Sequence, residues 1–514
     1  MTAVALRPVA VSQPPDRSHR MDRSPLRLGL VVPLPLWLLV GAGVLAVVVV
    51  AGIGALSPLL GVLALVGVAV GLWLAQRPVL LALVAVIVVP VSSGLRRGLP
   101  LPGLRLSEVL TVFSAVVVLG LAARILPGPR WRLWDVAALT YCGGAFAFGL
   151  LDAALQQVPI TSDDVQTMLG PMQFFLLYRM VAAAFATAEL RTIAMRMLLL
   201  FSIPVSALAA LQEVGPPIFQ HVALSITGTT VFDTPGWDPV RRATSVFPIW
   251  HALAGYLIVV ALLAIALLLR GRGEVLSSFW LLVVLGGAVV GLVFSLTATP
   301  VIGLLVGVLF IGRLLRRLGL VITWLLVGTL ISLAAFFPLV SERIAAQSTA
   351  TPATPTAGTS LLPQTIQYRL DVWAQQYLPA LRGNWVNGFG PADPPGIAWT
   401  HTESGYLTLV LRGGLGYVAI GCLLVYLSWR SGKRLMSLSR LPSEVALAAT
   451  VMALAAVLLL VNLTFPYLTA SGMPQPMWVL WGLVVAALGE VESKYERERL
   501  APRRGPAATL VSRP

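Results

Sequence analysis

Charged side chains are scarce in this chain. Only 11% of its 514 residues are Asp, Glu, Lys or Arg, whereas 57% are hydrophobic. Globular domains carry about 25% charged residues, so the composition excludes an ordinary soluble protein. Apolar runs of roughly 20 residues, the length that a helix needs to cross a bilayer, recur between residues 34 and 491. The sequence therefore predicts an all-α fold, a polytopic transmembrane helical bundle of about 12–14 spans.

Cysteine and histidine are also rare. Cys142 and Cys422 both lie inside apolar runs, which indicates structural thiols. The four histidines are His19, His221, His251 and His401, and none has a second His or Cys at a metal-ligand spacing. The sequence therefore predicts neither a metal site nor a cofactor.

Lysine is almost absent, so the basic character comes from arginine. The formal charge is +15, but the 36 basic residues are spread over many short loops rather than gathered on one stretch. This pattern argues against a nucleic-acid partner and favours positive-inside topology. With the N-terminus inside, 26 basic residues fall in inside segments and eight in outside segments. We expect a multi-pass protein of the cytoplasmic membrane with both termini in the cytoplasm.

Hydropathy and charge divide the chain into five parts. They are a disordered basic cytoplasmic tail (1–33), a transmembrane bundle (34–338) with an outer loop at 213–247, a large extracytoplasmic loop (339–402), C-terminal transmembrane helices (403–491) and a basic cytoplasmic tail (492–514).

The large loop contains a pattern typical of an amphipathic helix. Its apolar residues recur at helical spacing and are Ile366, Leu370, Trp373, Tyr377 and Leu381. Such a helix lies on the bundle or at the membrane surface.

A polar cluster, His401 to Ser404, precedes the first C-terminal span. His401 would lie beside the positive end of the helix dipole, which favours the neutral imidazole and hence a base at neutral pH. We take His401 and Glu403 as the catalytic candidates. The structural alternative is that Thr402 caps the helix, with Glu403 and Ser404 forming a polar collar at the interface.

Several arginines run against the topology and are candidates for substrate binding. Arg241 and Arg242 face outward just before a span, where guanidinium groups suit a diphosphate. The alternative is pairing with Asp233 or Asp238, or with lipid headgroups. Arg369, on the amphipathic helix, has Asp371 as its alternative partner.

Arg179 and a glycine-rich stretch fall inside predicted spans. An unpaired charge in lipid is costly, so Arg179 should face a polar interior, which makes it a further substrate-binding candidate, or extend to the cytoplasmic interface. The glycines of the RGGLG stretch, Gly413, Gly414 and Gly416, favour close helix packing over a phosphate-binding loop.

Four segments in order resemble the O-antigen ligase and polymerase superfamily of polytopic glycan transferases. They are RRATSVFPIWHALAGYL before a span, YRLDVW on the loop helix, the turn NGFGP, and HTESGYLTLVLRGGLG at the start of the next span. The resemblance covers roughly residues 240–425.

The resemblance implies an enzyme that works without a metal. His401 would activate an acceptor hydroxyl, while Arg242, with Arg369 or Arg241, would grip the diphosphate of an undecaprenyl-linked glycan donor. The implied partners are this donor, a glycan or lipid acceptor, membrane lipids and other envelope glycan assembly proteins. Thr299 and Pro300 stand where many members carry a Ser-Arg pair, which leaves open a different donor.

Two other functional classes compete with the transferase. A transporter or flippase of lipid-linked glycans would place discontinuous or charged helices at mid-membrane. An inactive relative that serves as a scaffold would explain the missing arginine.

Overall fold

The computed structural model describes residues 58–96, 105–125, 131–157, 160–228, 242–349, 364–390 and 402–500. Within these ranges every regular element is a helix, and the predicted all-α polytopic fold is confirmed. The predicted basic tail (1–33) and first span (34–54) lie outside the described residues, as do Arg241 and His401.

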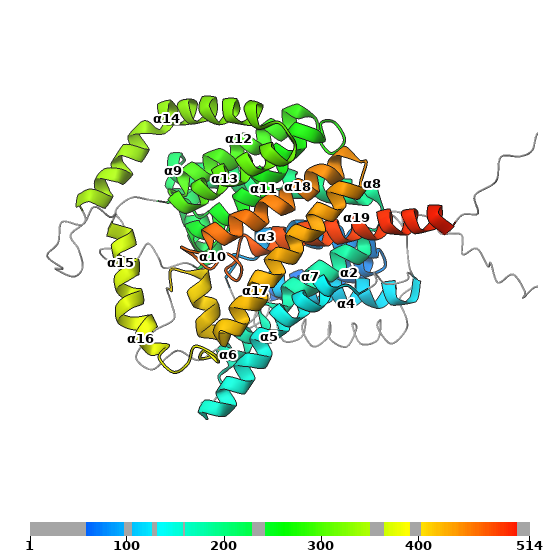
Figure 1. Cartoon of the computed structure of the whole chain (residues 1–514), viewed down its shortest axis with the longest axis horizontal. Coiled ribbons are helices and arrows are strands. Elements are labelled where there is room, and N and C mark those ends of the chain that lie inside the picture. Colours follow the sequence, from blue (N-terminus) through cyan, green and yellow to red (C-terminus); the bar gives the residue numbers. More distant parts are fainter. Residues whose placement is uncertain are drawn as a thin grey trace, which may run out of the picture.

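The bounds of the helices are α2 (Pro58–Ala75), α3 (Pro78–Ser92), α4 (Leu106–Ile125), α5 (Leu133–Gln156), α6 (Ser162–Leu169), α7 (Met172–Ala184), α8 (Ala188–Leu200), α9 (Ser202–Val214), α10 (Pro217–Thr227), α11 (Trp250–Arg270), α12 (Ser278–Phe294), α13 (Ala298–Leu314), α14 (Leu318–Thr349), α15 (Gln364–Val372), α16 (Leu378–Ala380), α17 (Gly405–Leu438), α18 (Pro442–Val461) and α19 (Pro474–Leu500). In Figure 1, α19 runs nearly horizontally, α5 and α17 rise obliquely from lower left to upper right, and α15 stands upright at the left.

The described residues contain 6 helical stretches long and apolar enough to cross a membrane. They are α5, α8 together with α9, α11, α17, α18 and α19. Shorter apolar helical stretches accompany them in α3, α4, α7, α12, α13 and α14. The protein is therefore a polytopic helical membrane protein.

Helix α11 forms the centre of the bundle. Every residue from Ala252 to Leu268 is buried, and α11 packs against α12, α13 and α18. A helix that is apolar on all sides and buried on all sides belongs to the interior of a bundle. Helix α14 lies at the periphery, along the top of Figure 1, with Leu326, Leu330 and Phe337 more than 60% exposed. These side chains suit contact with lipid.

Ion pairs hold one end of the bundle, which we call the charged end. Arg191 of α8 pairs with Glu444 of α18 and Glu490 of α19. Arg179 of α7 donates to Asp135 of α5 over 2.7 Å. Because a buried charge is tolerated in a membrane protein only when it is paired, these contacts fasten five helices together.

The opposite end, which we call the cavity end, is where α4, α7, α11 and α17 begin. It also carries α10, which forms inside the predicted outer loop 213–247. Pro217 starts α10 and Gly228 ends it with a left-handed φ of 63°, the usual proline-first and glycine-last pattern.

Two helices extend beyond their predicted ends. Helix α14 continues past residue 338 to Thr349, because Pro338 is accommodated inside it. Helix α19 continues past residue 491 to Leu500, where Glu492 pairs with Arg132 and Arg434 at the charged end. Part of each segment predicted as loop or tail is therefore helical.

Candidate functional site

Helix α17 is broken near its start. Gly413 and Gly414 leave the helical conformation, with Gly414 at φ 67° and ψ −169°. This region of backbone space is open essentially to glycine alone. The break divides α17 into a short first part, Gly405–Arg412, and a long second part that runs to Leu438.

The turn of residues 384–390, which we call the docked turn, fills this break. The amide of Phe389 donates to the Leu411 carbonyl over 2.6 Å, and the amide of Leu415 donates to the Trp385 carbonyl over 2.9 Å. A Cβ on Gly388 would lie 2.5 Å from the Leu411 oxygen, and one on Gly414 would overlap the Val386 carbonyl. The glycines therefore permit a loop backbone to enter the helix. For these glycines the sequence favoured close helix packing over a phosphate-binding loop, and the structure shows a further role for Gly413 and Gly414, at a break in the helix.

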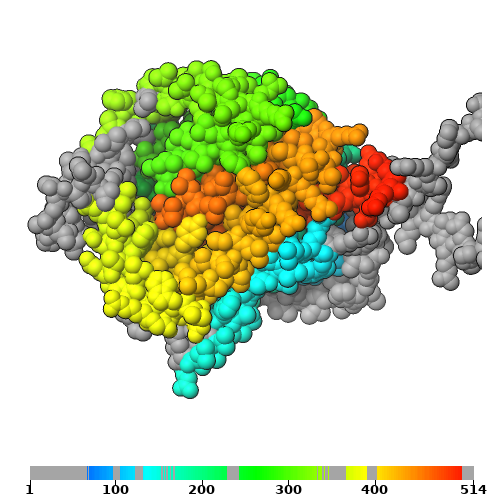
Figure 2. Space-filling model, viewed as in Figure 1, coloured from blue at the N-terminus to red at the C-terminus, as the bar shows by residue number. Residues whose placement is uncertain are grey.

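The predicted amphipathic helix exists, but only part of its expected apolar face is covered. Tyr377 and Leu381 are buried against Phe389, Val410 and Leu411, whereas Ile366 and Leu370 are 41% and 45% exposed. A turn of π-helix at Trp373–Tyr377 separates the covered part from the exposed part. The extra residue of a π turn rotates the side chains on its N-terminal side relative to those on its C-terminal side. The segment 364–390, yellow in Figure 2, thus covers the start of α17.

An ion pair joins this segment to the residues before α17. The Nε and Nη2 atoms of Arg369 both donate to Oε2 of Glu403, over 3.0 and 2.8 Å. The indole of Trp373 donates to the Thr402 carbonyl over 2.9 Å. Glu403 itself has φ 51°, an uncommon value for a residue with a side chain. Two predicted site residues, Arg369 and Glu403, are therefore in direct contact, and Asp371 is not the acidic partner of this bridge.

Ser404, rather than Thr402, caps α17. The Ser404 hydroxyl accepts from the Leu407 amide, while the Thr402 hydroxyl contacts that of Thr408. The alternative in which Thr402 caps the helix is therefore wrong, because the capping residue is Ser404. The helix begins at Gly405, so His401 lies four positions before the first helical residue in the sequence.

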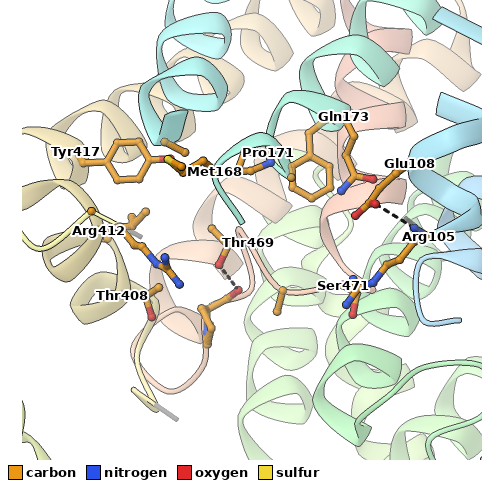
Figure 3. A pocket seen from close by; sticks show the side chains of 17 residues that line it. Arg105, Glu108, Met168, Pro171, Gln173, Thr408, Arg412, Tyr417, Thr469 and Ser471 are labelled. Carbon is orange, nitrogen blue, oxygen red and sulfur yellow. Dashed lines mark hydrogen bonds between the residues drawn. The ribbon is translucent and has the colours of Figure 1, made fainter. Parts of the chain in front are cut away.

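A cavity of about 380 Å³, lined by both polar and apolar side chains, lies beside the break, between α4, α5, α7 and the first part of α17. Figure 3 shows Arg412 and Thr408 entering from one side, and Arg105, Glu108 and Gln173 from the other. Thr469 and Ser471 of the loop between α18 and α19 complete the polar lining. Gly390, at the end of the docked turn, also lines it. The cavity therefore touches the segment that resembles the glycan transferases.

The loop 462–473, between α18 and α19, connects the cavity to the segment 242–251, which contains the predicted site residue Arg242. Its Phe465 stacks on His251, with ring centroids 4.5 Å apart, and Pro466 lines the cavity. Arg242 lies 4.4 Å above the Trp250 ring. The stacking of His251 on Phe465 therefore joins the segment 242–251 to the loop 462–473 at the cavity end.

Tyr467 of the same loop lies close to the Arg369–Glu403 pair. Burial raises the pKa of its phenol above the ordinary value of 10.0; the charge of Arg369 opposes this rise and that of Glu403 adds to it. Asn462, one turn earlier, accepts the Gly405 amide through its backbone carbonyl over 2.7 Å. The loop 462–473 thus fixes the start of α17.

Arg179 is not among the residues that line the cavity. Its guanidinium pairs with Asp135, which also accepts from the Tyr178 hydroxyl over 2.6 Å and from the Arg132 amide over 2.7 Å; the guanidinium lies 5.0 Å from the Trp131 ring. Asp135 belongs to the first turn of α5, next to the Arg132–Glu492 pair of the charged end. The structure therefore gives Arg179 a polar interior partner, as one of the sequence interpretations expected, but at the end away from the cavity.

Sequence reasoning missed Arg105 and Arg412 as site residues. Arg412 interrupts an apolar run, and an intramembrane charge is itself a signal of function. Arg105 directly precedes a predicted span on the outside, the same signal that singled out Arg242. Only the fold places both arginines in one cavity.

The contact between Arg369 and Glu403 makes a measurable prediction. We expect Arg369→Gln and Glu403→Gln each to lower the free energy of unfolding by about 1 kcal/mol, because the pair is only partly exposed. In the double variant the two losses should not add, since either one already breaks the contact. Thermal unfolding of the detergent-purified protein measures this coupling. Arg382→Gln, an exposed arginine of the same segment, is the matched control. Fully additive losses would contradict the assigned contact.

The described residues contain no group of three or more His, Cys, Asp or Glu that could hold a metal ion. The absence of a metal requirement stays a prediction. A comparison with models of known protein families and one with curated proteins both find no match for this chain.

Proposed function

We propose that this protein is a membrane glycosyltransferase that moves a glycan from a polyprenyl-diphosphate donor to an acceptor hydroxyl. The acceptor oxygen attacks the anomeric carbon, the bond from that carbon to the diphosphate oxygen breaks, and the lipid diphosphate leaves. The acceptor proton passes to a base, which we assign to His401. The reaction balances without a metal or a cofactor.

The observation that carries the proposal is the convergence of the motif segments. The segments 242–251, 364–390 and 402–416 are far apart in the sequence, yet all contact the cavity lining or the loop 462–473 that forms part of it. A transferase of lipid-linked glycans needs a base and a phosphate-binding group at one place. The cavity supplies arginines for the phosphate-binding group, and the proposed base, His401, directly precedes Thr402 in the sequence.

The position of the cavity relative to the membrane suits a lipid headgroup. Arg412 and Arg430 of α17 are 18 positions apart with no charged residue between them. This corresponds to roughly 27 Å of helix, about the thickness of a bilayer's hydrocarbon core. Arg412 then lies near one boundary of the hydrocarbon, where the diphosphate of a membrane-anchored donor would lie.

The distribution of basic residues supports a cavity that faces away from the cytoplasm. The charged end carries Arg132, Arg191 and Arg434, which belong to segments predicted to be inside. Positive-inside topology therefore assigns the charged end to the cytoplasm and the cavity to the outer face of the cytoplasmic membrane.

A transporter of lipid-linked glycans is the second candidate. The observation that favours it is the break in α17 beside Arg412, since discontinuous helices form the substrate sites of many transporters. The break lies near the boundary of the hydrocarbon rather than at mid-membrane, which is why the transferase remains our proposal.

Deletion of the protein from its native host tests the proposal. For a transferase, we expect lipid-linked glycan to accumulate on the outer face of the membrane. Single repeats on lipid would identify a polymerase, and complete polymer left on lipid would identify a ligase. Intermediates that accumulate on the cytoplasmic face would instead identify a transporter and contradict the proposal. An unchanged set of lipid-linked glycans would contradict both.

A further inference from the structure

The cavity contains two arginines from helices that are far apart in the sequence. Arg105 precedes α4, and its backbone amide donates to Glu108 over 3.0 Å. Arg412 ends the first part of α17, directly before the Gly413–Gly414 break. Figure 3 shows the two side chains approaching the cavity from different sides. Two guanidinium groups and one carboxylate give the lining a net positive charge.

The polar groups between the arginines suit the oxygens of an anion. Gln173 and Ser471 line the same cavity and carry groups that can donate hydrogen bonds, whereas the Thr408 hydroxyl donates to the Ser404 carbonyl. A guanidinium binds a phosphate group through two parallel N–H bonds. Two guanidinium groups therefore match a ligand that has two phosphate groups better than they match a ligand that has a single carboxylate.

The arginines expected from the motif are not among the residues that line this cavity. Both Nε and Nη2 of Arg369 are directed to Glu403, and Arg242 lies over the Trp250 ring. The hairpin between α12 and α13 has Thr299 and Pro300 where the resemblance would place an arginine. Among the residues that line the cavity, the cations that could bind phosphate are Arg105 and Arg412; Nη1 of Arg105 also donates to the Ser93 carbonyl over 3.5 Å.

We propose that Arg105 and Arg412 form the diphosphate-binding site of this protein, with Arg412 positioned by the glycine break in α17. Arg369 is then a positioning residue, because it holds the segment 364–390 against Glu403. The identity of the lipid that carries the diphosphate rests on the proposed function. The binding of a diphosphate by these two arginines does not.

Direct binding by the full chain in lipid nanodiscs tests this site. The probe is farnesyl diphosphate, with empty nanodiscs subtracted. We expect Arg105→Gln and Arg412→Gln each to raise Kd by about tenfold to a hundredfold, because each removes charge-assisted hydrogen bonds to phosphate. Arg412→Lys should lose less affinity, since it keeps the charge but not the paired N–H geometry. Arg382→Gln, which removes an exposed arginine of the segment 364–390, should bind as the unchanged protein does.

Further probes identify what the site recognises. Farnesol should not compete, because it lacks the diphosphate. Competition by inorganic pyrophosphate as strong as that of farnesyl diphosphate would assign the site to a free diphosphate, and weaker competition to a lipid-linked one. Both results support the two-arginine site. Competition by phosphatidylglycerol equal to that of farnesyl diphosphate would overturn it, because a single phosphate would suffice.

Three results would overturn the inference. They are no binding by the unchanged protein, unchanged affinity in Arg412→Gln, and an equal loss in Arg382→Gln. Size-exclusion profiles and thermal midpoints of the variants distinguish lost binding from lost folding, and Arg412→Lys repeats the test with the charge retained. Binding that depends on both arginines in a protein without transfer activity would contradict the proposed function and leave this inference standing.

Discussion

Gly414→Ala is expected to destabilise the protein by at least about 3 kcal/mol and to release the segment 384–390 from α17. Gly414 adopts φ 67° and ψ −169°, a conformation that alanine avoids, and the added Cβ would overlap the Val386 carbonyl. Relief requires the turn to withdraw, which would break the hydrogen bond between the Leu415 amide and the Trp385 carbonyl. Arg412 would then lose the backbone geometry that directs it into the cavity.

Gly416→Ala is the matched control for this change. A Cβ at Gly416 meets nothing within 4 Å, and the residue lies in the regular part of α17. Alanine there should be neutral or stabilise the helix by about 0.5–1 kcal/mol. Thermal unfolding and limited proteolysis within the segment 384–390 measure both effects. Equal thermal midpoints and equal cleavage for the two variants would show that the loop does not depend on the break.

His401→Ala should reduce glycan transfer by about 10²- to 10⁴-fold, the usual contribution of a general base. The protein should remain folded and inserted, because α17 is capped by Ser404 and the segment 364–390 is held by Arg369 and Trp373. The initial rate of transfer in membranes measures the effect.

His221→Ala is the control for the histidine substitution, because His221 is exposed on α10 at the same end of the protein. It should leave the transfer rate unchanged. A His401→Ala variant as active as the His221→Ala variant would remove His401 from the mechanism. The proton would then have to pass to another group of the cavity end.

The helices could be predicted because their signals are local. An apolar run of about 20 residues that ends at Arg, Pro or Gly determines a span without reference to the rest of the chain. The same reasoning found the helix of the large loop from the spacing of Trp373, Tyr377 and Leu381. It did not find the π turn that separates these residues from Ile366 and Leu370, because that turn depends on packing against α17.

The site was predicted only in part because its contacts join distant segments. Arg369 and Glu403 were both singled out, but their pairing across 34 positions was not, since Asp371 is nearer in the sequence. The Gly413–Gly414 pair is compatible with close packing or with a break. The docked turn decides between them, and no local pattern specifies that docking. Arg412 carried the signal of an intramembrane charge, but only the fold places it in the same cavity as Arg105.

Reconstitution tests the central claim most directly. The purified chain is placed in liposomes that contain a polyprenyl-diphosphate donor with a fluorescent glycan, together with an acceptor glycan. Our account predicts that elongated glycan and free polyprenyl diphosphate appear in equal amounts, and that Arg412→Gln suppresses both. Movement of intact donor across the bilayer without any new glycosidic product would contradict it.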